Sequence, residues 1–343
     1  MAQTTRTAYK EFGTTGLTVS RICLGTWEAG GDWGSVDENQ FINAIRAARE
    51  EGINFFDTAQ AYGFGASERL LGKALADDVR SRRDEIVIAT KGGLRMQGDR
   101  LVRDASPAWL RAGVESSLKA LGTDYIDLYQ VHWPDPATPI SETATALGAL
   151  VREGKIRFVG VSNFDVAQMA EFGKTRKLDA LQPPYHVFRR DVEREILPYC
   201  KAHGIGVLIY GPLAHGLLSG ATNENTTFAP DDWRSKSPVF RGEEFAKNLR
   251  VVSALKAFAV KRGISLAQLA IAWTLANPAV DVAIVGVRNP KHVGELARAS
   301  HIALAPEDLR EIDTILAPAV PVGGPSPEGT VSYTHLKLPT ILR

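Results

Sequence analysis

The sequence predicts an α/β fold, a (β/α)8 TIM barrel with an N-terminal β-hairpin and two extra helices near its C-terminal part. Eight β-rich runs alternate with helical segments, mostly at intervals of roughly thirty residues. Eight such units are the number that closes a barrel. An open doubly wound sheet is the alternative, but no G-x-G-x-x-G sequence follows the first strand, which favours the barrel.

The β-rich runs are short, apolar and bounded by glycine, asparagine or charged residues. The first two runs flank Gly13-Thr-Thr-Gly16, a turn that predicts a hairpin before the main fold. The expected hairpin arms and strands cover residues 9–12, 17–20, 21–25, 53–56, 86–90, 126–131, 156–161, 178–182, 206–210 and 282–286.

Capping signals place the helices between these strands. Asp37 with Gln40, and Asp165 with Gln168, have the spacing of a capping box. Ser106-Pro107 combines a cap with proline at the first helical position. Helices are expected near 37–52, 67–75, 106–122, 141–153, from 165 onward, 191–203, 243–261, 265–276, after 289 and from 306.

Three stretches depart from the repeat. The gap between the seventh and eighth strands holds the polar segment 221–242, expected as a lid or binding loop, and then the two extra helices. Residues 1–317 are expected to form one barrel domain, and the proline- and glycine-rich stretch 318–343 a flexible tail. The last residues, Ser332–Arg343, follow no pattern of the barrel and are interpreted as a non-native appendage without function.

Composition excludes several classes of function. The 343 residues include 40 basic and 39 acidic side chains, a net charge of +1, which gives no electrostatic case for nucleic acid or an acidic membrane. Cys23 and Cys200 are the two cysteines, and no spacing typical of a metal site occurs. Without a bilayer-long apolar run or a secretory signal at the N-terminus, a cytoplasmic location is expected.

Polar side chains stand where successive strands end. Asp57 ends the strand near 53–56, Lys91 follows the strand 86–90, and His132 follows the strand 126–131. Tyr62 comes five positions after Asp57. Because catalytic groups of a TIM barrel lie at the carboxyl ends of its strands, these four residues are expected to meet at one rim.

The four residue types suit proton donation to an oxygen. A free tyrosine has a pKa of about 10, and a nearby ammonium favours its phenolate, which makes Tyr62 a better acid near neutral pH. Lys91 would supply that charge, Asp57 would hold Lys91, and His132 would hydrogen-bond the oxygen that receives the proton. No serine or cysteine nucleophile stands beside a base in the sequence, so a cofactor hydride is expected to attack the carbon.

The local motifs around these residues resemble those of the aldo-keto reductases. Asp57-Thr-Ala-x-x-Tyr62-Gly63, Thr90-Lys91 and Tyr129-Gln-x-His132-Trp133 match the family's catalytic segments, and the resemblance covers residues 7–317. It implies an NADPH-dependent reductase of aldehydes or ketones, including sugar- or polyol-derived ones, with a small-molecule substrate. The layout is most similar to the bacterial branch that includes inositol-operon reductases and potassium-channel β subunits.

The resemblance also implies the residues that bind cofactor and substrate. Ser162, Asn163 and Gln182 would bind the nicotinamide carboxamide, Tyr210 would stack on its ring, and Arg288 would meet the adenosine 2′-phosphate. The full cofactor set is Gly25, Thr26, Trp27, Asp57, Ser162, Asn163, Gln182, Tyr210, Gly211, Pro212, Leu213, Leu217, Ser219, Gly220, Gly286, Arg288, His292 and Glu295. The substrate pocket would comprise Trp27, Tyr62, His132 and Trp133, with the loop 94–100 beside them.

Several alternatives stay open at this point. Glu295 is followed by Leu296 where the family often has asparagine, and His292 stands where a longer polar side chain is common, so the preference for NADPH over NADH is open. The fold could instead serve as an NADPH sensor docked on a partner. An aldolase using Lys91 as a Schiff base is a third reading, disfavoured because Asp57 would keep that lysine charged. Oligomeric state and substrate identity are also open.

Overall fold

The computed structural model describes residues 7–30, 37–230, 232–287 and 289–326. Within them, eight parallel strands form a closed barrel in the order β10-β11-β12-β3-β4-β5-β8-β9. The predicted (β/α)8 barrel is therefore confirmed. Its strands are β3 (Ile22–Gly25), β4 (Phe55–Asp57), β5 (Val87–Gly92), β8 (Ile126–Val131), β9 (Ile156–Ser162), β10 (Ala180–Gln182), β11 (Gly206–Tyr210) and β12 (Val282–Gly286).

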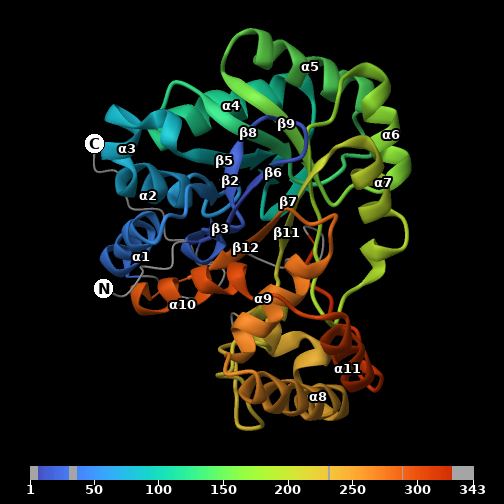
Figure 1. The fold of residues 1–343 in the computed structure, drawn as a ribbon. Coiled ribbons are helices and arrows are strands. Elements are labelled where there is room, and N and C mark those ends of the chain that lie inside the picture. The colour runs from blue at the N-terminus through green and yellow to red at the C-terminus, as the bar shows by residue number, and fades with distance from the viewer. Residues whose placement is uncertain (1–6, 31–36, 231, 288, 327–343) are drawn as a thin grey trace.

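Helices surround the barrel (Figure 1), and the helices capped by Asp37, Ser106 and Asp165 begin where the sequence predicts. Asp165 and Gln168 form the predicted capping box, whereas Asp37 caps its helix through the backbone N–H groups of Asn39 and Gln40. The helices are α1 (Glu38–Glu50), α2 (Ala66–Ala74), α3 (Ala76–Ser81), α4 (Pro107–Leu121), α5 (Ile140–Arg152), α6 (Val166–Thr175), α7 (Ile196–His203), α8 (Gly242–Lys261), α9 (Leu266–Ala276), α10 (Val293–Arg298) and α11 (Pro306–Leu316). The two extra helices are α8 and α9, between β11 and β12.

The N-terminal hairpin closes the end of the barrel where the strands begin. It consists of β1 (Tyr9–Glu11) and β2 (Thr18–Ser20), paired antiparallel as predicted. Phe12, in the turn, is 1% exposed and packs edge-on against Phe55 at the start of β4. A Cβ atom at Gly206 would lie 2.9 Å from the Phe12 ring, so the glycine at this position leaves the space that the ring occupies.

The structure corrects two of the predicted elements. The loop expected at 94–100 is an antiparallel hairpin, β6 (Leu94–Gln97) and β7 (Arg100–Arg103), joined by Gly98-Asp99. Gly98 has φ +59°, a conformation that glycine adopts readily, and a Gly-Asp dipeptide between two strands is a sequence signal for a two-residue hairpin turn. The helix expected over 191–203 is divided into a 3-10 turn, Asp191–Glu193, and α7.

The segment 318–326 is held against the barrel, although its composition predicts a loose tail from Pro318. Val322 is fully buried, and its N–H donates to the Phe188 carbonyl at 3.1 Å. The carboxamide of Asn248 on α8 donates to the Val320 carbonyl and accepts from the Val320 N–H. Tertiary contacts with α8 therefore fix a stretch that has no regular structure. The suspected appendage at 332–343 lies outside the described residues.

Candidate active site

Asp57 and Lys91 meet inside the barrel because their strands are neighbours. Residues Phe55–Asp57 of β4 pair in register with Val87–Ala89 of β5, and Lys91 lies two residues further along β5. The Lys91 side chain is fully buried and Asp57 is 3% exposed. The Lys91 Nζ lies 2.5 Å from Asp57 Oδ1. A buried ammonium and a buried carboxylate at this distance compensate each other's loss of hydration.

The Lys91 ammonium also contacts Tyr62. Its Nζ donates to the Thr58 carbonyl at 2.9 Å and to the Tyr62 hydroxyl at 3.3 Å. Together with Asp57 these contacts match the three N–H groups of an ammonium. The chain places Tyr62 here because the Thr58 N–H donates to the Ala89 carbonyl and the Gln60 N–H to the Lys91 carbonyl, so the loop after β4 follows the end of β5.

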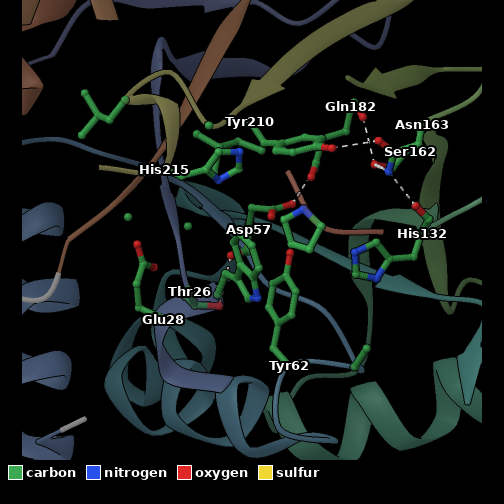
Figure 2. A pocket seen from close by; sticks show the side chains of 18 of the residues that line it. Thr26, Glu28, Asp57, Tyr62, His132, Ser162, Asn163, Gln182, Tyr210 and His215 are labelled. Carbon is green, nitrogen blue, oxygen red and sulfur yellow. Dashed lines mark hydrogen bonds between the residues drawn. The ribbon is translucent and has the colours of Figure 1, made fainter. Parts of the chain in front are cut away.

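His132 completes the predicted group of four. Its ring lies edge-on to the Tyr62 ring, with centroids 5.7 Å apart, and Figure 2 shows both rings beside Asp57. Burial lowers the pKa of His132 well below its usual range, and the charge of Lys91 lowers it further. His132 is therefore neutral near pH 7 and can donate one ring N–H. Its Nδ1 has no hydrogen-bond partner among the described residues.

A hydrogen-bonded chain of side chains forms the opposite wall. Burial raises the pKa of Tyr210 to about 12, and its protonated hydroxyl donates to Asn163 Oδ1 at 2.9 Å. Asn163 in turn donates to the Ser162 hydroxyl and to the His132 carbonyl, as Figure 2 shows. The Ser162 hydroxyl donates to the Gln182 carbonyl at 2.9 Å. Asn163 has φ +62°, a left-handed conformation that asparagine tolerates better than most residues.

These residues line one cavity of about 460 Å³ at the carboxyl ends of the strands. This is the size and the place expected for a ligand site in a TIM barrel. Predicted residues that line it are Gly25, Thr26, Trp27, Asp57, Tyr62, His132, Trp133, Ser162, Asn163, Gln182, Tyr210, Gly211, Pro212, Leu213, Ser219 and Gly286.

The model of the Aldo/keto reductase family matches residues 21–317. Aldo-keto reductase YhdN of Bacillus subtilis (strain 168) is 44% identical over 319 residues, which are 92% of this chain and 96% of that protein. The chain belongs to the aldo-keto reductase family.

Solved structures agree with this assignment. The glycerol dehydrogenase AKR11B4 from Gluconobacter oxydans is 40% identical with a TM-score of 0.83, and the match covers 95% of this chain and 98% of that one. An aldo/keto reductase from Klebsiella pneumoniae, solved in complex with NADP and acetate, is 31% identical with a TM-score of 0.71, over 91% and 96% of the two chains.

Two less similar relatives bear on the branch that the sequence predicted. An NADH-specific methylglyoxal reductase of Escherichia coli (strain K12) is 36% identical, over 86% of this chain and 94% of that protein. A probable voltage-gated potassium channel subunit beta of Arabidopsis thaliana is 34% identical, over 90% and 96%. The predicted similarity both to bacterial reductases and to channel β subunits is confirmed.

Some residues in the aldo-keto reductase cofactor set lie away from the cavity. Leu217 is fully buried in the core, and Gly220 is exposed beyond the loop that lines the cavity. His292 and Glu295 lie around the start of α10, where the Glu295 carbonyl accepts from Gln268 of α9. Arg288 lies outside the described residues. The cofactor roles of these five residues stay predictions, as do those of the residues that line the cavity.

The cavity also contains residues that the sequence did not single out. Glu28 projects into it, and a Cβ atom at Gly286 would overlap the Glu28 carboxylate. Strand-end position would have found Glu28, which lies three residues after β3. Leu94 lies in the loop 94–100 that the sequence placed beside the substrate, and Trp233 and Arg234 lie in the segment 221–242 expected as a lid or binding loop. The others are Ala61, Leu101, His215, Gly216, Ile284, Val285, Pro325 and Ser326, which only the fold brings together.

Three further features concern metal ions, membranes and the two cysteines. No group of three or more His, Cys, Asp or Glu side chains that could hold a metal ion occurs in the described part of this aldo-keto reductase. Within that part, none of the helices has the length and apolar character needed to cross a membrane. Cys23 and Cys200 are free and buried, and burial raises the pKa of both thiols, so neither is a reactive thiolate.

Proposed function

We propose that this aldo-keto reductase reduces aldehydes or ketones to alcohols with NADPH, and that Tyr62 is the general acid. The observation that carries the proposal is the contact of a fully buried ammonium with the Tyr62 hydroxyl, at 3.3 Å from Lys91 Nζ. A buried cation favours the phenolate that remains after the proton has left. The same ammonium is bound to Asp57, which keeps it charged and fixed in place.

The cavity suits a nicotinamide cofactor. Its wall combines hydroxyl and carboxamide groups (Ser162, Asn163, Gln182) with the Tyr210 ring, and the loop residues Gly211, Leu213, Gly216 and Ser219 line the same cavity. Amide and hydroxyl groups match a carboxamide, an aromatic face matches a planar ring, and backbone N–H groups match phosphate oxygens. We assign the nicotinamide end to the first group and the pyrophosphate to the second. When bound, the nicotinamide supplies the hydride for the carbonyl carbon.

Side chains of the protein would donate the proton and a hydrogen bond to the carbonyl oxygen. Tyr62 lies within reach of Lys91 on one side and beside the His132 ring on the other. A carbonyl oxygen placed between Tyr62 and His132 would receive the Tyr62 proton and a hydrogen bond from the neutral imidazole. Because burial and Lys91 lower the pKa of His132, we assign it as hydrogen-bond donor rather than as the acid.

The substrate is proposed as a small aldehyde or ketone, including sugar- or polyol-derived carbonyls. Ala61, Leu94, Leu101 and Trp133 form an apolar wall of the cavity on the side of Tyr62 and His132. This wall accommodates an aliphatic or aromatic group. The relatives named glycerol dehydrogenase and methylglyoxal reductase act on small oxygenated compounds, which supports testing both kinds of substrate.

The test is consumption of NADPH, and in parallel of NADH, with small aromatic aldehydes and sugar-derived ketones. The wild-type protein is compared with Tyr62→Phe, which removes the proposed acid and keeps the ring. We expect turnover in the wild type and a loss of roughly 10²- to 10⁴-fold in the variant. Fluorescence titration should show that the variant still binds NADPH. Unchanged turnover in the variant would exclude Tyr62 as the acid.

A second candidate function is an NADPH-binding sensor docked on another protein, which the similarity to a channel β subunit favours. An intact set of catalytic residues is compatible with both functions. Rapid exchange of NADPH with turnover supports the enzyme. Very tight retention of NADPH without turnover on any carbonyl supports the sensor.

A further inference from the structure

Gln130 is a buried polar residue at the centre of the barrel, next to the proposed catalytic group. It lies on β8 two residues before His132, and its side chain is fully buried. In the sheet it is in register with Lys91 of β5 on one side and with Gly160 of β9 on the other. Branched aliphatic residues usually fill the interior of a TIM barrel, so a carboxamide here needs compensating contacts.

Those contacts connect Gln130 to two other inward-facing residues. Gln130 Nε2 donates to Asp57 Oδ2 at 3.3 Å, and Gln182 Nε2 donates to the same oxygen at 2.9 Å. Gln182 Nε2 also lies 3.3 Å from Gln130 Oε1, as donor to acceptor. Asp57 Oδ1 is taken by Lys91, so the carboxylate has a cation on one oxygen and two carboxamides on the other.

The neighbouring strand is shaped around this side chain. A Cβ atom at Gly160 would lie 2.9 Å from Gln130 Cγ and 3.2 Å from the Ala180 carbonyl oxygen. Even alanine at position 160 would push Gln130 away from Asp57 and Gln182. Glycine inside a strand weakens the strand, and such a residue marks a place where another group approaches closely.

We propose that Gln130 is a positioning residue that joins Asp57 to Gln182 in one buried hydrogen-bond network. The assignment rests on the proposed function, in which Asp57 holds Lys91 and Gln182 binds the nicotinamide carboxamide. Gln130 thereby couples the proton-transfer side of the site to its cofactor side. It touches neither substrate nor the Tyr62 hydroxyl, and it acts through the orientation of the two residues that it contacts.

Two substitutions separate this role from simple packing. Gln130→Met keeps the length of the side chain and removes both hydrogen bonds. We expect about a tenfold loss of kcat and a severalfold rise in the KM for NADPH, with an unfolding midpoint within a few degrees of the wild type. Gln130→Glu keeps the shape but places a second carboxylate against Asp57, and like charges in contact are unfavourable.

The pH dependence of Gln130→Glu gives the decisive readout. At pH 8 its introduced carboxyl is ionised and cannot donate, so we expect a loss larger than that of Gln130→Met. As the pH falls toward 5.5 the carboxyl protonates and can donate to Asp57, so the ratio of the two variants' kcat/KM should reverse in favour of Gln130→Glu. If Gln130 only fills space, a protonated Gln130→Glu would be no more active than Gln130→Met at pH 5.5, and that result would overturn the proposal.

Thr274→Val is the control for the loss of a buried hydrogen bond away from the site. Thr274 is fully buried on α9, and its hydroxyl donates to the Ile271 carbonyl at 2.8 Å. Removing this hydroxyl should leave kcat and the KM for NADPH within twofold of the wild type. If the wild type reduces no carbonyl, the proposed function fails; the KM prediction is then replaced by the Kd for NADPH. If both Gln130 variants then bind NADPH with the wild-type Kd, the positioning role of Gln130 is overturned, whatever the outcome for the proposed function.

Discussion

The two ends of the barrel are built from the same strands but bury opposite kinds of side chain. Where the strands begin, Phe12, Val19, Phe55 and Leu208 pack into an apolar cluster that the hairpin covers. Where they end, polar and charged groups are buried instead: Asp57, Lys91, Gln130, Ser162 and Gln182. We call these the closed end and the catalytic end.

The difference shows how the fold divides stability from chemistry. Burial of apolar surface at the closed end stabilises the barrel by about 25 cal/mol for each Å². Burial of ions and amides at the catalytic end costs hydration, which the mutual contacts of those groups offset. Substitutions at the closed end should therefore lower stability alone, whereas substitutions at the catalytic end should lower activity as well.

Lys91→Met is the substitution with the largest expected effect on activity. It removes the cation that contacts both Asp57 and Tyr62, and turnover should fall roughly 10²- to 10⁴-fold. It also leaves a buried carboxylate without its cation, which should lower the free energy of unfolding by about 3–5 kcal/mol. Steady-state kinetics and urea unfolding measure the two losses. Lys155→Met, which removes exposed ion pairs with Glu115 and Glu153 before β9, should leave both measurements close to the wild type.

Phe12→Ala tests the closed end. The ring is 1% exposed, and removing it leaves a cavity beside Phe55, so the free energy of unfolding should fall by about 3–5 kcal/mol. At a temperature where the variant stays folded, kcat should remain within twofold of the wild type. Glu11→Ala, on the exposed side of the same hairpin, should cost less than about 0.5 kcal/mol. A large loss of kcat in folded Phe12→Ala would show that the two ends are not separate.

Acid should lower the free energy of unfolding through three buried histidines. Burial lowers the pKa of His132 and His186 well below the usual range, and that of His215 to about 3. Below about pH 6.5 the unfolded chain binds protons that the folded chain does not. The free energy of unfolding therefore decreases as the pH is lowered. The slope should reach about 1.4 kcal/mol per pH unit for each of these histidines.

Urea unfolding at pH 7.5, 6.5 and 5.5 measures this slope. His186 is 1% exposed and both its ring nitrogens lack a hydrogen-bond partner among the described residues, so His186→Phe should remove its share of the slope. His203→Gln, at an exposed position on α7, serves as the control. An unchanged slope in His186→Phe would assign the acid sensitivity to other groups.

Asn248→Ala should change activity only modestly, through the binding of the carbonyl substrate. Asn248 is fully buried on α8 and fixes Val320 through two hydrogen bonds, upstream of the cavity-lining Pro325 and Ser326. Loosening this segment should raise the KM for the carbonyl substrate roughly threefold and leave kcat nearly unchanged. Asn39→Ala, on the exposed face of α1, is the control. An equal change of kcat and KM in Asn248→Ala would contradict a role confined to the cavity wall.

Sequence patterns predicted much of the fold and the catalytic group because these follow from local rules. Asp165 with Gln168 predicted the start of α6, since a capping box involves residues only three positions apart. Asp57, Lys91 and His132 were found because parallel strands place their carboxyl ends at one rim. The β6–β7 hairpin was missed although Gly98-Asp99 indicated it, because each flanking run has only four residues and Val102 is the only β-branched or aromatic residue in them.

The sequence by itself determined the barrel, the helix ends and the four residues proposed for proton transfer, because each depends on neighbours along the chain or on the order of strand ends. The tertiary structure alone decided which remote residues join them. Gln130 contacts Gln182 across 52 positions, and Asn248 holds Val320 across 72. Local composition makes 318–326 look loose, yet contacts with distant elements order it. Such contacts depend on the packed geometry of the whole barrel, which no local pattern encodes.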